Sequence, residues 1–126
     1  MADLNHLKLI NDSYGHAEGD ALIAAAADAL KQNLHSAQAI YRISGDEFTA
    51  VYLSANESIL RSEIESVHTA CKQYTSLPIP LSMALGYAVS TPGEEVSAVF
   101  ERADKDMYEK KQAMKRAGLV FPRPNS

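Results

Sequence analysis

Two short runs rich in β-branched and aromatic residues, one close after the other, constrain the fold of this chain most. The runs are Ala39–Ile43 and Phe48–Leu53, and the four residues Ser44-Gly45-Asp46-Glu47 separate them. A short connection that contains a glycine favours a β-hairpin, in which Gly45 can adopt a positive φ angle. The hairpin predicts that the chain contains a β-sheet.

The rest of the chain shows mainly helical spacing of apolar residues. Helices are predicted over Asp3–Tyr14, from about Gly19 to Leu34, from about Asn56 to Tyr74, and from about Val96 to Arg116. The breaks at Pro78 and Pro80 are followed by a buried strand predicted over Leu81–Ser90, and the tail Val120–Ser126 is expected to be irregular. Helices alternating with strands predict an α/β fold (an α+β sandwich) with a mixed central β-sheet flanked by helices.

Composition restricts the function. The chain has 126 residues, of which 46% are hydrophobic, and this suits one domain with a real core. Its formal net charge of −4 would repel a nucleic-acid backbone, so no nucleic acid polymer is expected as a partner. Cys71 has no second cysteine to pair with and lies on a predicted apolar helix stripe, which favours a core position. With no apolar run long enough to span a bilayer, a cytoplasmic location without membrane contact is expected, although the parent protein could be membrane-anchored.

The stretch from Asp3 to Asp20 holds more polar side chains than packing requires. A carboxylate just before a helix can hold a hard cation, and the free N–H groups at the start of that helix can receive phosphate oxygens. Asp3 and the N–H groups near His6 and Leu7 fit this description, with Lys8 as a nearby positive charge. The alternative is that Asp3 only caps the helix.

Asp46 and Glu47 place two adjacent carboxylates in the predicted turn. Their repulsion is relieved by solvent or by a cation, so a solvated turn and a metal site both remain open. Mg²⁺ typically takes one or two protein carboxylates and completes its shell with water and phosphate oxygens. Asp3 and Asp46 together therefore make a plausible site for a magnesium nucleotide. Lys111 is unusual because it falls on the apolar face of the last helix, between Met107 and Met114, which favours a functional role.

Three segments resemble the motifs of the GGDEF domain family. The first, Asp3 to Asp20, resembles D-[IL]-D-x-F-K-x-I-N-D-x-x-G-H-x-x-G-D, and Arg42 to Phe48 resembles R-x-G-G-D-E-F. The third, Ala103 to Lys111, resembles A-D-x-A-[ML]-Y-x-A-K. The motifs occur in the family's order and cover the chain to about Ala117, so residues 1–118 are expected to form the domain and residues 119–126 a tail.

The resemblance implies a role for each matched residue. Asp3, Asp46 and the backbone carbonyl of Leu4 would hold Mg²⁺, or Mn²⁺ in its place. Asp46 and Glu47 would be the catalytic residues, with Asp46 accepting the proton of a ribose 3′-hydroxyl. Asn11 and Asp20 would read the guanine base, and His16 would contact the substrate. Lys8, Lys111 and Lys115 would bind the phosphates. His16 has a structural alternative in satisfying backbone groups, and Lys115 has one as a solvated helix end.

The family activity implied is diguanylate cyclase, which condenses two GTP molecules into cyclic di-GMP and pyrophosphate. Each domain would hold one GTP, so a homodimer of antiparallel domains is implied, with an upstream sensory or receiver domain in the parent protein. An alternative is a non-catalytic GTP-sensing or cyclic di-GMP-sensing module, or a regulatory partner of a neighbouring phosphodiesterase domain.

The chain departs from the family pattern at several places. Asn5, His6 and Leu7 stand where the family often has Asp, Phe and Phe, a mild departure because the backbone N–H groups used there do not depend on the side chain. Ser44 replaces the first glycine of the signature, which gives S-G-D-E-F. The family's opening D-x-L-T-G-L-x-N-R segment is not found, and only Met1 and Ala2 precede Asp3. A truncated domain without the central strand before Asp3 is therefore expected. Its sheet would be compromised or completed by another chain. The family's Arg-x-x-Asp product-inhibition motif is replaced by His35-Ser36-Ala37-Gln38, so that site is expected to be lost.

Overall fold

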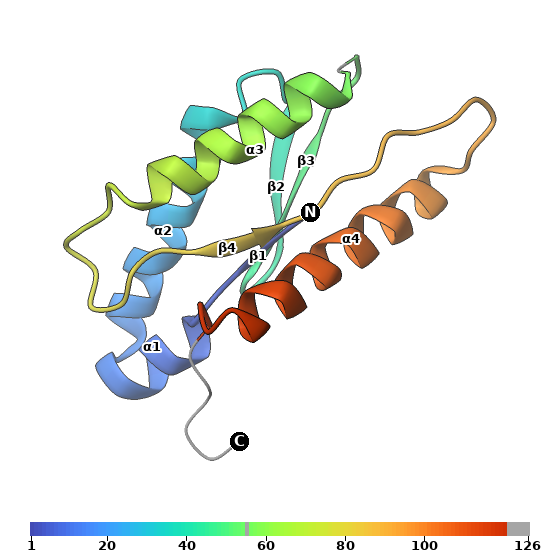
Figure 1. The fold of residues 1–126 in the computed structure, drawn as a ribbon. Coiled ribbons are helices and arrows are strands. Elements are labelled where there is room, and N and C mark those ends of the chain that lie inside the picture. Colours follow the sequence, from blue (N-terminus) through green and yellow to red (C-terminus); the bar gives the residue numbers. More distant parts are fainter. Residues whose placement is uncertain (55, 121–126) are drawn as a thin grey trace.

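A computed structural model describes residues 1–54 and 56–120 of the chain (Figure 1). Strands and helices are interspersed along it. In chain order they are β1 (Ala2–Leu4), α1 (Leu7–Tyr14), α2 (His16–Asn33), β2 (Ala39–Ser44), β3 (Glu47–Val51), α3 (Glu57–Cys71), β4 (Met83–Leu85) and α4 (Val96–Arg116).

The strands form one sheet in the order β2-β3-β1-β4, and all three neighbouring pairs are antiparallel. The predicted α/β class is confirmed, but the expectation of a mixed sheet is wrong for the strands that the structure describes. β1 is central, because Ala2 pairs with Phe48 of β3 on one side and with Leu85 of β4 on the other. The expectation that no strand leads into Asp3 is therefore also wrong.

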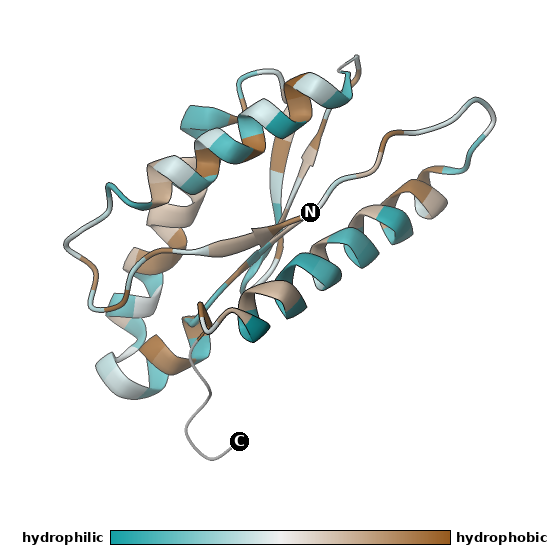
Figure 2. Cartoon of the chain, in the orientation of Figure 1, coloured by the Kyte–Doolittle hydropathy of each residue, from teal (hydrophilic) through white to brown (hydrophobic). Residues whose placement is uncertain are grey.

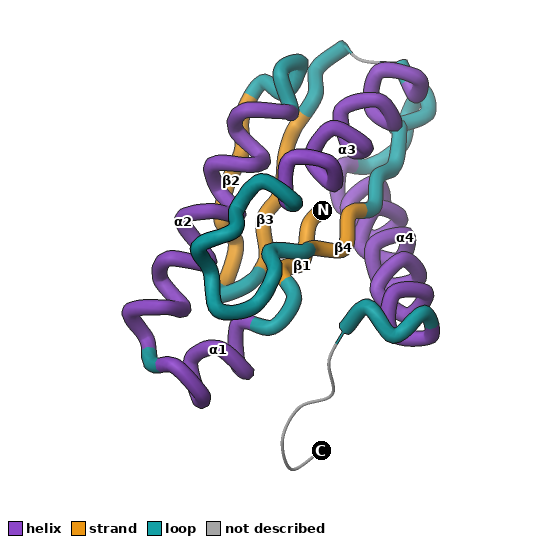
Figure 3. Tube along the Cα trace, turned by 60° about the vertical axis from the view of Figure 1, so that its left-hand side comes forward, coloured by secondary structure: helices purple, strands orange, loops and turns teal. Residues whose placement is uncertain are grey.

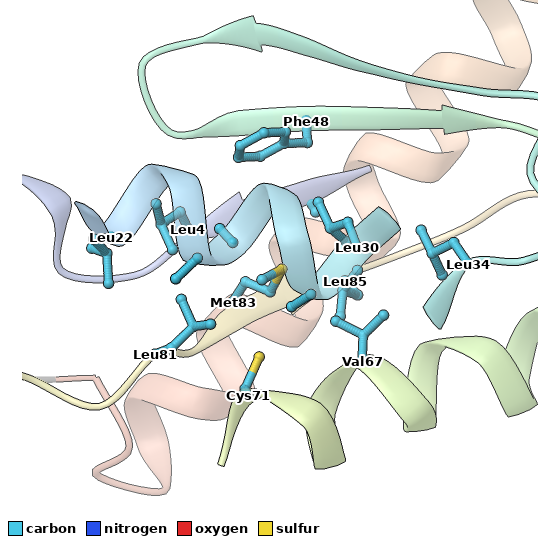
Figure 4. Close-up of a cluster of buried hydrophobic side chains, with 14 of the residues drawn as sticks. Leu4, Leu22, Leu30, Leu34, Phe48, Val67, Cys71, Leu81, Met83 and Leu85 are labelled. Atoms are coloured by element: carbon cyan, nitrogen blue, oxygen red, sulfur yellow. The ribbon is translucent and has the colours of Figure 1, made fainter. Parts of the chain in front are cut away.

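Helices cover the sheet on both faces (Figures 1 and 3). α2 and α3 lie on one face, and α4 lies on the other. The main core lies between the sheet and the α2–α3 layer, and Figure 4 shows Phe48, Leu30, Met83 and Val67 pointing into it from β3, α2, β4 and α3. Cys71 is buried in the same cluster, as predicted, and burial raises the pKa of its thiol to about 11.

The start of the chain differs most from the sequence prediction. The helix predicted over Asp3–Tyr14 begins only at Leu7, because the preceding residues pair with strands on both sides. His6 has a left-handed backbone, with φ 72°, and separates the strand from the helix. Gly15, with φ 93°, ends α1 as predicted, and α2 then begins at His16, before the predicted Gly19.

The hairpin forms as predicted, with Ser44 paired to Glu47 across a tight turn and a register shift between Arg42 and Ser44. The turn does not use the positive φ angle that was open to Gly45. β4 is shorter than the predicted strand over Leu81–Ser90, since only Met83–Leu85 pairs with β1. From Phe121 onward the predicted irregular tail lies outside the described residues.

α4 lies very close to the end of β4. A Cβ atom on Gly86 would lie 2.0 Å from the backbone nitrogen of Met107, so the helix approaches as closely as it does because residue 86 has no side chain. The predicted apolar stripe of α4 is buried at Ala103 and Met107, but Val96 is 70% exposed. Figure 2 shows most of α4 in the hydrophilic colour. Of the helices described, none combines the length and apolar character needed to span a membrane.

Candidate functional site

Asp3 and Lys111 form an ion pair between the central strand and α4. Asp3 is 9% exposed, and the Lys111 ammonium donates to its Oδ2. Burial raises the pKa of Asp3, the hydrogen bond and charge of Lys111 oppose this rise, and the nearby Asp46 and Asp104 carboxylates add to it. This explains why a lysine occupies an otherwise apolar helix face: it accompanies a buried carboxylate.

The β2–β3 turn lies against the end of β1. The backbone N–H of Leu4 donates to the backbone oxygen of Asp46 over 2.7 Å, and Asp3 pairs with Glu47 across the two strands. Burial raises the pKa of Glu47, and the charges of Asp3, Asp46 and Asp104 raise it further. The turn and β1 thus form one acidic cluster that includes Asp3, Asp46 and Glu47.

Asn5 joins this cluster to its surroundings. It is 1% exposed, and its Nδ2 donates to the Ser82 Oγ over 3.0 Å and to the Met114 sulfur over 3.7 Å. Its backbone N–H donates to the Ser82 oxygen over 3.0 Å. Because Met114 is three residues after Lys111, Asp3 and Asn5 together dock the C-terminal half of α4 onto β1 and the loop that follows it.

The two residues expected to read the guanine base, Asn11 and Asp20, and the expected substrate contact His16 all lie on the α1–α2 pair. Asn11 is half-buried near the end of α1, His16 is the exposed first residue of α2, and Asp20 is exposed one turn later. Asp20 lines a groove of about 840 Å³ that runs along α2 to β2, with Ile23 and Phe48 among its apolar residues. A second, mainly apolar cavity of about 340 Å³ is lined by residues of β3, of the segment after β4, of α2 and α3 and of the N-terminal half of α4, and Asp3, Asp46 and Lys111 do not line it.

Two predicted phosphate lysines lie on exposed helix surfaces. Lys8 is in the first turn of α1 and pairs with Asp12 over 3.3 Å. Lys115 is exposed on α4, one turn after Lys111. The sequence interpretation gave no role to Asn5 or Asp104, although Asp104 precedes Lys111 by seven residues. This spacing of about two helical turns puts Asp104 and Lys111 on one side of α4. It is the sequence signal that could have placed Asp104 near the site.

The oxygen donors suit a small hard cation. Within residues 1–54 and 56–120, no group of three or more His, Cys, Asp and Glu side chains is arranged to hold a metal ion. Mg²⁺ needs only one or two protein carboxylates when substrate phosphates and water supply the rest. Asp3 and Asp46 supply that number of carboxylates, and a cation would favour the charged form of Asp3, whose pKa burial raises and the Asp46 and Asp104 charges raise further.

An antiparallel sheet lies between helices in this α/β domain, and carboxylates and a lysine gather around its central strand. Comparisons with known proteins make this specific: the family described as "Diguanylate cyclase, GGDEF domain" matches residues 1–117. The chain belongs to the GGDEF domain family.

Individual relatives agree with this assignment. The chain is 33% identical over 118 residues to the diguanylate cyclase DgcP of Pseudomonas aeruginosa, with 90% of the chain and 17% of that protein covered. It is 30% identical over 129 residues to the diguanylate cyclase DgcZ of Escherichia coli, covering 99% of the chain and 44% of that protein. The chain thus spans less than half the length of either relative. Among solved structures, the GGDEF domain of DgcB from Caulobacter crescentus, in complex with c-di-GMP, matches with a TM-score of 0.77 and 26% identity, covering 89% of this chain and 70% of that one.

Proposed function

We propose that this domain condenses two GTP molecules into cyclic di-GMP, as a diguanylate cyclase. The observation that carries the proposal is the contact between three segments distant in sequence, in which Asp3, the Asp46 turn and Lys111 meet at the central strand. Each segment belongs to a family motif, and together they supply carboxylates for a cation and a positive charge for a phosphate.

In this reaction the 3′-oxygen of one GTP forms a bond to the α-phosphorus of the other, and the bond from that phosphorus to the bridging oxygen of pyrophosphate breaks. Asp46 accepts the 3′-hydroxyl proton, Glu47 assists at the turn, and Lys8, Lys111 and Lys115 bind phosphates. Asp3, Asp46 and the Leu4 carbonyl hold Mg²⁺, or Mn²⁺. The cation supplies charge stabilisation at the phosphate oxygens.

Each domain offers one such set of residues, so one domain holds one GTP. Two bonds must form to close the cyclic product, and two domains must therefore face each other in antiparallel orientation. Control then comes from the parts of the full protein that bring two domains together, such as an upstream sensory or receiver domain. Ser44, in place of the first signature glycine, favours a second candidate: a non-catalytic module that senses GTP or cyclic di-GMP.

The first expected result concerns base selection. The chain binds GTP more tightly than ATP, because Asp20 accepts from the N1–H and 2-amino groups of guanine and the Asn11 amide donates to a purine acceptor. Losing a charged hydrogen-bond partner costs about 1.5–3 kcal/mol, so Asp20→Ala weakens GTP binding roughly 10- to 100-fold in calorimetry. Glu18→Ala, in the same helical turn, is the control and leaves affinity unchanged. Equal affinity for ATP and GTP in the unaltered chain would refute the assignment.

A second expected result concerns product inhibition. His35 and Gln38 are exposed on the α2–β2 loop, where the family motif has arginine and aspartate, so this loop lacks the forked cation and the carboxylate that grip the product. The active enzyme is therefore not arrested by cyclic di-GMP through this loop, whereas a His35→Arg, Gln38→Asp variant gains inhibition. Progress curves with added cyclic di-GMP test this. Potent non-competitive inhibition of the unaltered enzyme would contradict it.

A further inference from the structure

Gly19 lies against the side chain of Asn11. It is buried in the first turn of α2, and a Cβ atom built on it would lie 1.7 Å from the Asn11 Oδ1 and 2.8 Å from the Asn11 Cγ. Either distance is far below van der Waals contact. The amide group of Asn11 therefore lies in space that is open only because residue 19 has no side chain.

The backbone gives no other reason for a glycine at this position. Gly15, which joins α1 to α2, has a positive φ angle, whereas Gly19 has an ordinary helical backbone. Glycine is a poor helix former, so an alanine would favour the helix itself. The turn between the helices is made by Gly15, whose N–H closes the last turn of α1 by donating to the Asn11 backbone oxygen over 3.1 Å, and Gly19 takes no part in it through its φ angle.

A methyl group at residue 19 would displace the Asn11 amide rather than separate the helices. The clashing atoms are the end of a flexible side chain, and these move at less cost than backbone. Asp20 is the next residue and is exposed, so its carboxylate has room that a methyl group on residue 19 does not occupy. A substitution at Gly19 therefore moves the Asn11 amide and leaves the Asp20 carboxylate in place.

We propose that Gly19 is a positioning residue for base selection: it holds the Asn11 amide where that group donates to the acceptor edge of guanine, at O6 or N7. This inference rests on the proposed function, in which Asn11 and Asp20 read the base. Gly19 itself contacts no substrate and acts through Asn11.

The test uses calorimetry with 3′-deoxy nucleoside triphosphates, which cannot condense. The 6-thioguanine and 7-deazaguanine analogues weaken or remove the O6 and N7 acceptors, and the hypoxanthine analogue removes the 2-amino group that Asp20 reads. The unaltered chain discriminates against hypoxanthine and against at least one acceptor-edge analogue. In Gly19→Ala, the ratio of the affinity for guanine to that for the acceptor-edge analogue falls about tenfold, which is the scale of one hydrogen bond. The ratio of the affinity for guanine to that for hypoxanthine stays unchanged.

Two further variants control the experiment. Asn11→Ala reproduces the loss, and adding Gly19→Ala to it causes no further change, because the displaced group is already gone. Ala17→Gly makes the reverse exchange at an exposed position in the same turn and leaves discrimination unchanged. Thermal unfolding of Gly19→Ala occurs at or above the temperature of the unaltered chain.

Retention of full acceptor-edge discrimination by Gly19→Ala overturns the inference and leaves the proposed function standing. Loss of both kinds of discrimination also overturns it, because that result means a general loosening of the α1–α2 pair. If the unaltered chain binds the other purine nucleotides as tightly as GTP, the base assignment of the proposed function fails, and this inference fails with it.

Discussion

Asp46→Ala reduces cyclic di-GMP synthesis by roughly a thousandfold or more, because one substitution removes both the proposed proton acceptor and a proposed ligand of the cation. General base catalysis alone contributes about 10²- to 10⁴-fold to an enzymatic rate. The measurement is product formation from GTP and Mg²⁺, followed by chromatography, on the full protein that carries this domain.

The fold survives this substitution, because the contact between the turn and β1 uses the backbone oxygen of Asp46, which alanine retains. Thermal unfolding of the variant is therefore close to that of the unaltered protein. Ser44→Gly is the matched control in the same turn, and it keeps activity because it restores the family's signature glycine. Substantial activity in a folded Asp46→Ala protein would contradict the site.

Lys111→Met has the second largest expected effect. Methionine retains most of the apolar length of lysine but removes the ammonium group, which leaves the buried Asp3 without its ion-pair partner. It also removes the proposed charge-assisted contact to a phosphate, and such a contact contributes about 1.5–3 kcal/mol, so kcat/KM for GTP falls roughly 10- to 100-fold.

The adjacent lysine provides the control for this prediction. Lys110 is exposed and pairs with Asp106 over 3.1 Å, so Lys110→Met removes the same charge from α4 without affecting Asp3. Its kcat/KM stays near that of the unaltered enzyme, and Lys111→Arg restores part of the lost activity. Equal losses for Lys110→Met and Lys111→Met would show that only the overall charge of α4 matters.

Local signals in the sequence were sufficient for much of the fold. The hairpin of β2 and β3 has a glycine turn and β-prone flanks, and α3 has both an apolar stripe and Asn56, whose side chain accepts from the Ile59 N–H over 2.9 Å at the helix start. β1 was missed because three residues carry no periodicity. It is a strand only because β3 and β4 lie on either side, which is a tertiary effect.

The site was predictable where a residue was out of place in its local pattern. Lys111 interrupts an apolar stripe, and Asp46 and Glu47 place like charges side by side. By contrast, the roles of Asn5 and Gly19 depend on contacts between elements: Asn5 contacts Ser82 and Met114, more than 70 residues away in sequence, and Gly19 contacts a side chain of the preceding helix. Neither contact has a signature in the local sequence.

The most direct test of the central claim is to incubate the full protein with GTP and Mg²⁺, at concentrations where two copies associate, and to measure cyclic di-GMP and pyrophosphate together. Diguanylate cyclase activity predicts two pyrophosphates for each cyclic di-GMP, with a rate that rises more steeply than the first power of protein concentration. Tight GTP binding without any cyclic di-GMP, in protein shown to be dimeric, would contradict the claim and identify the domain as a sensing module.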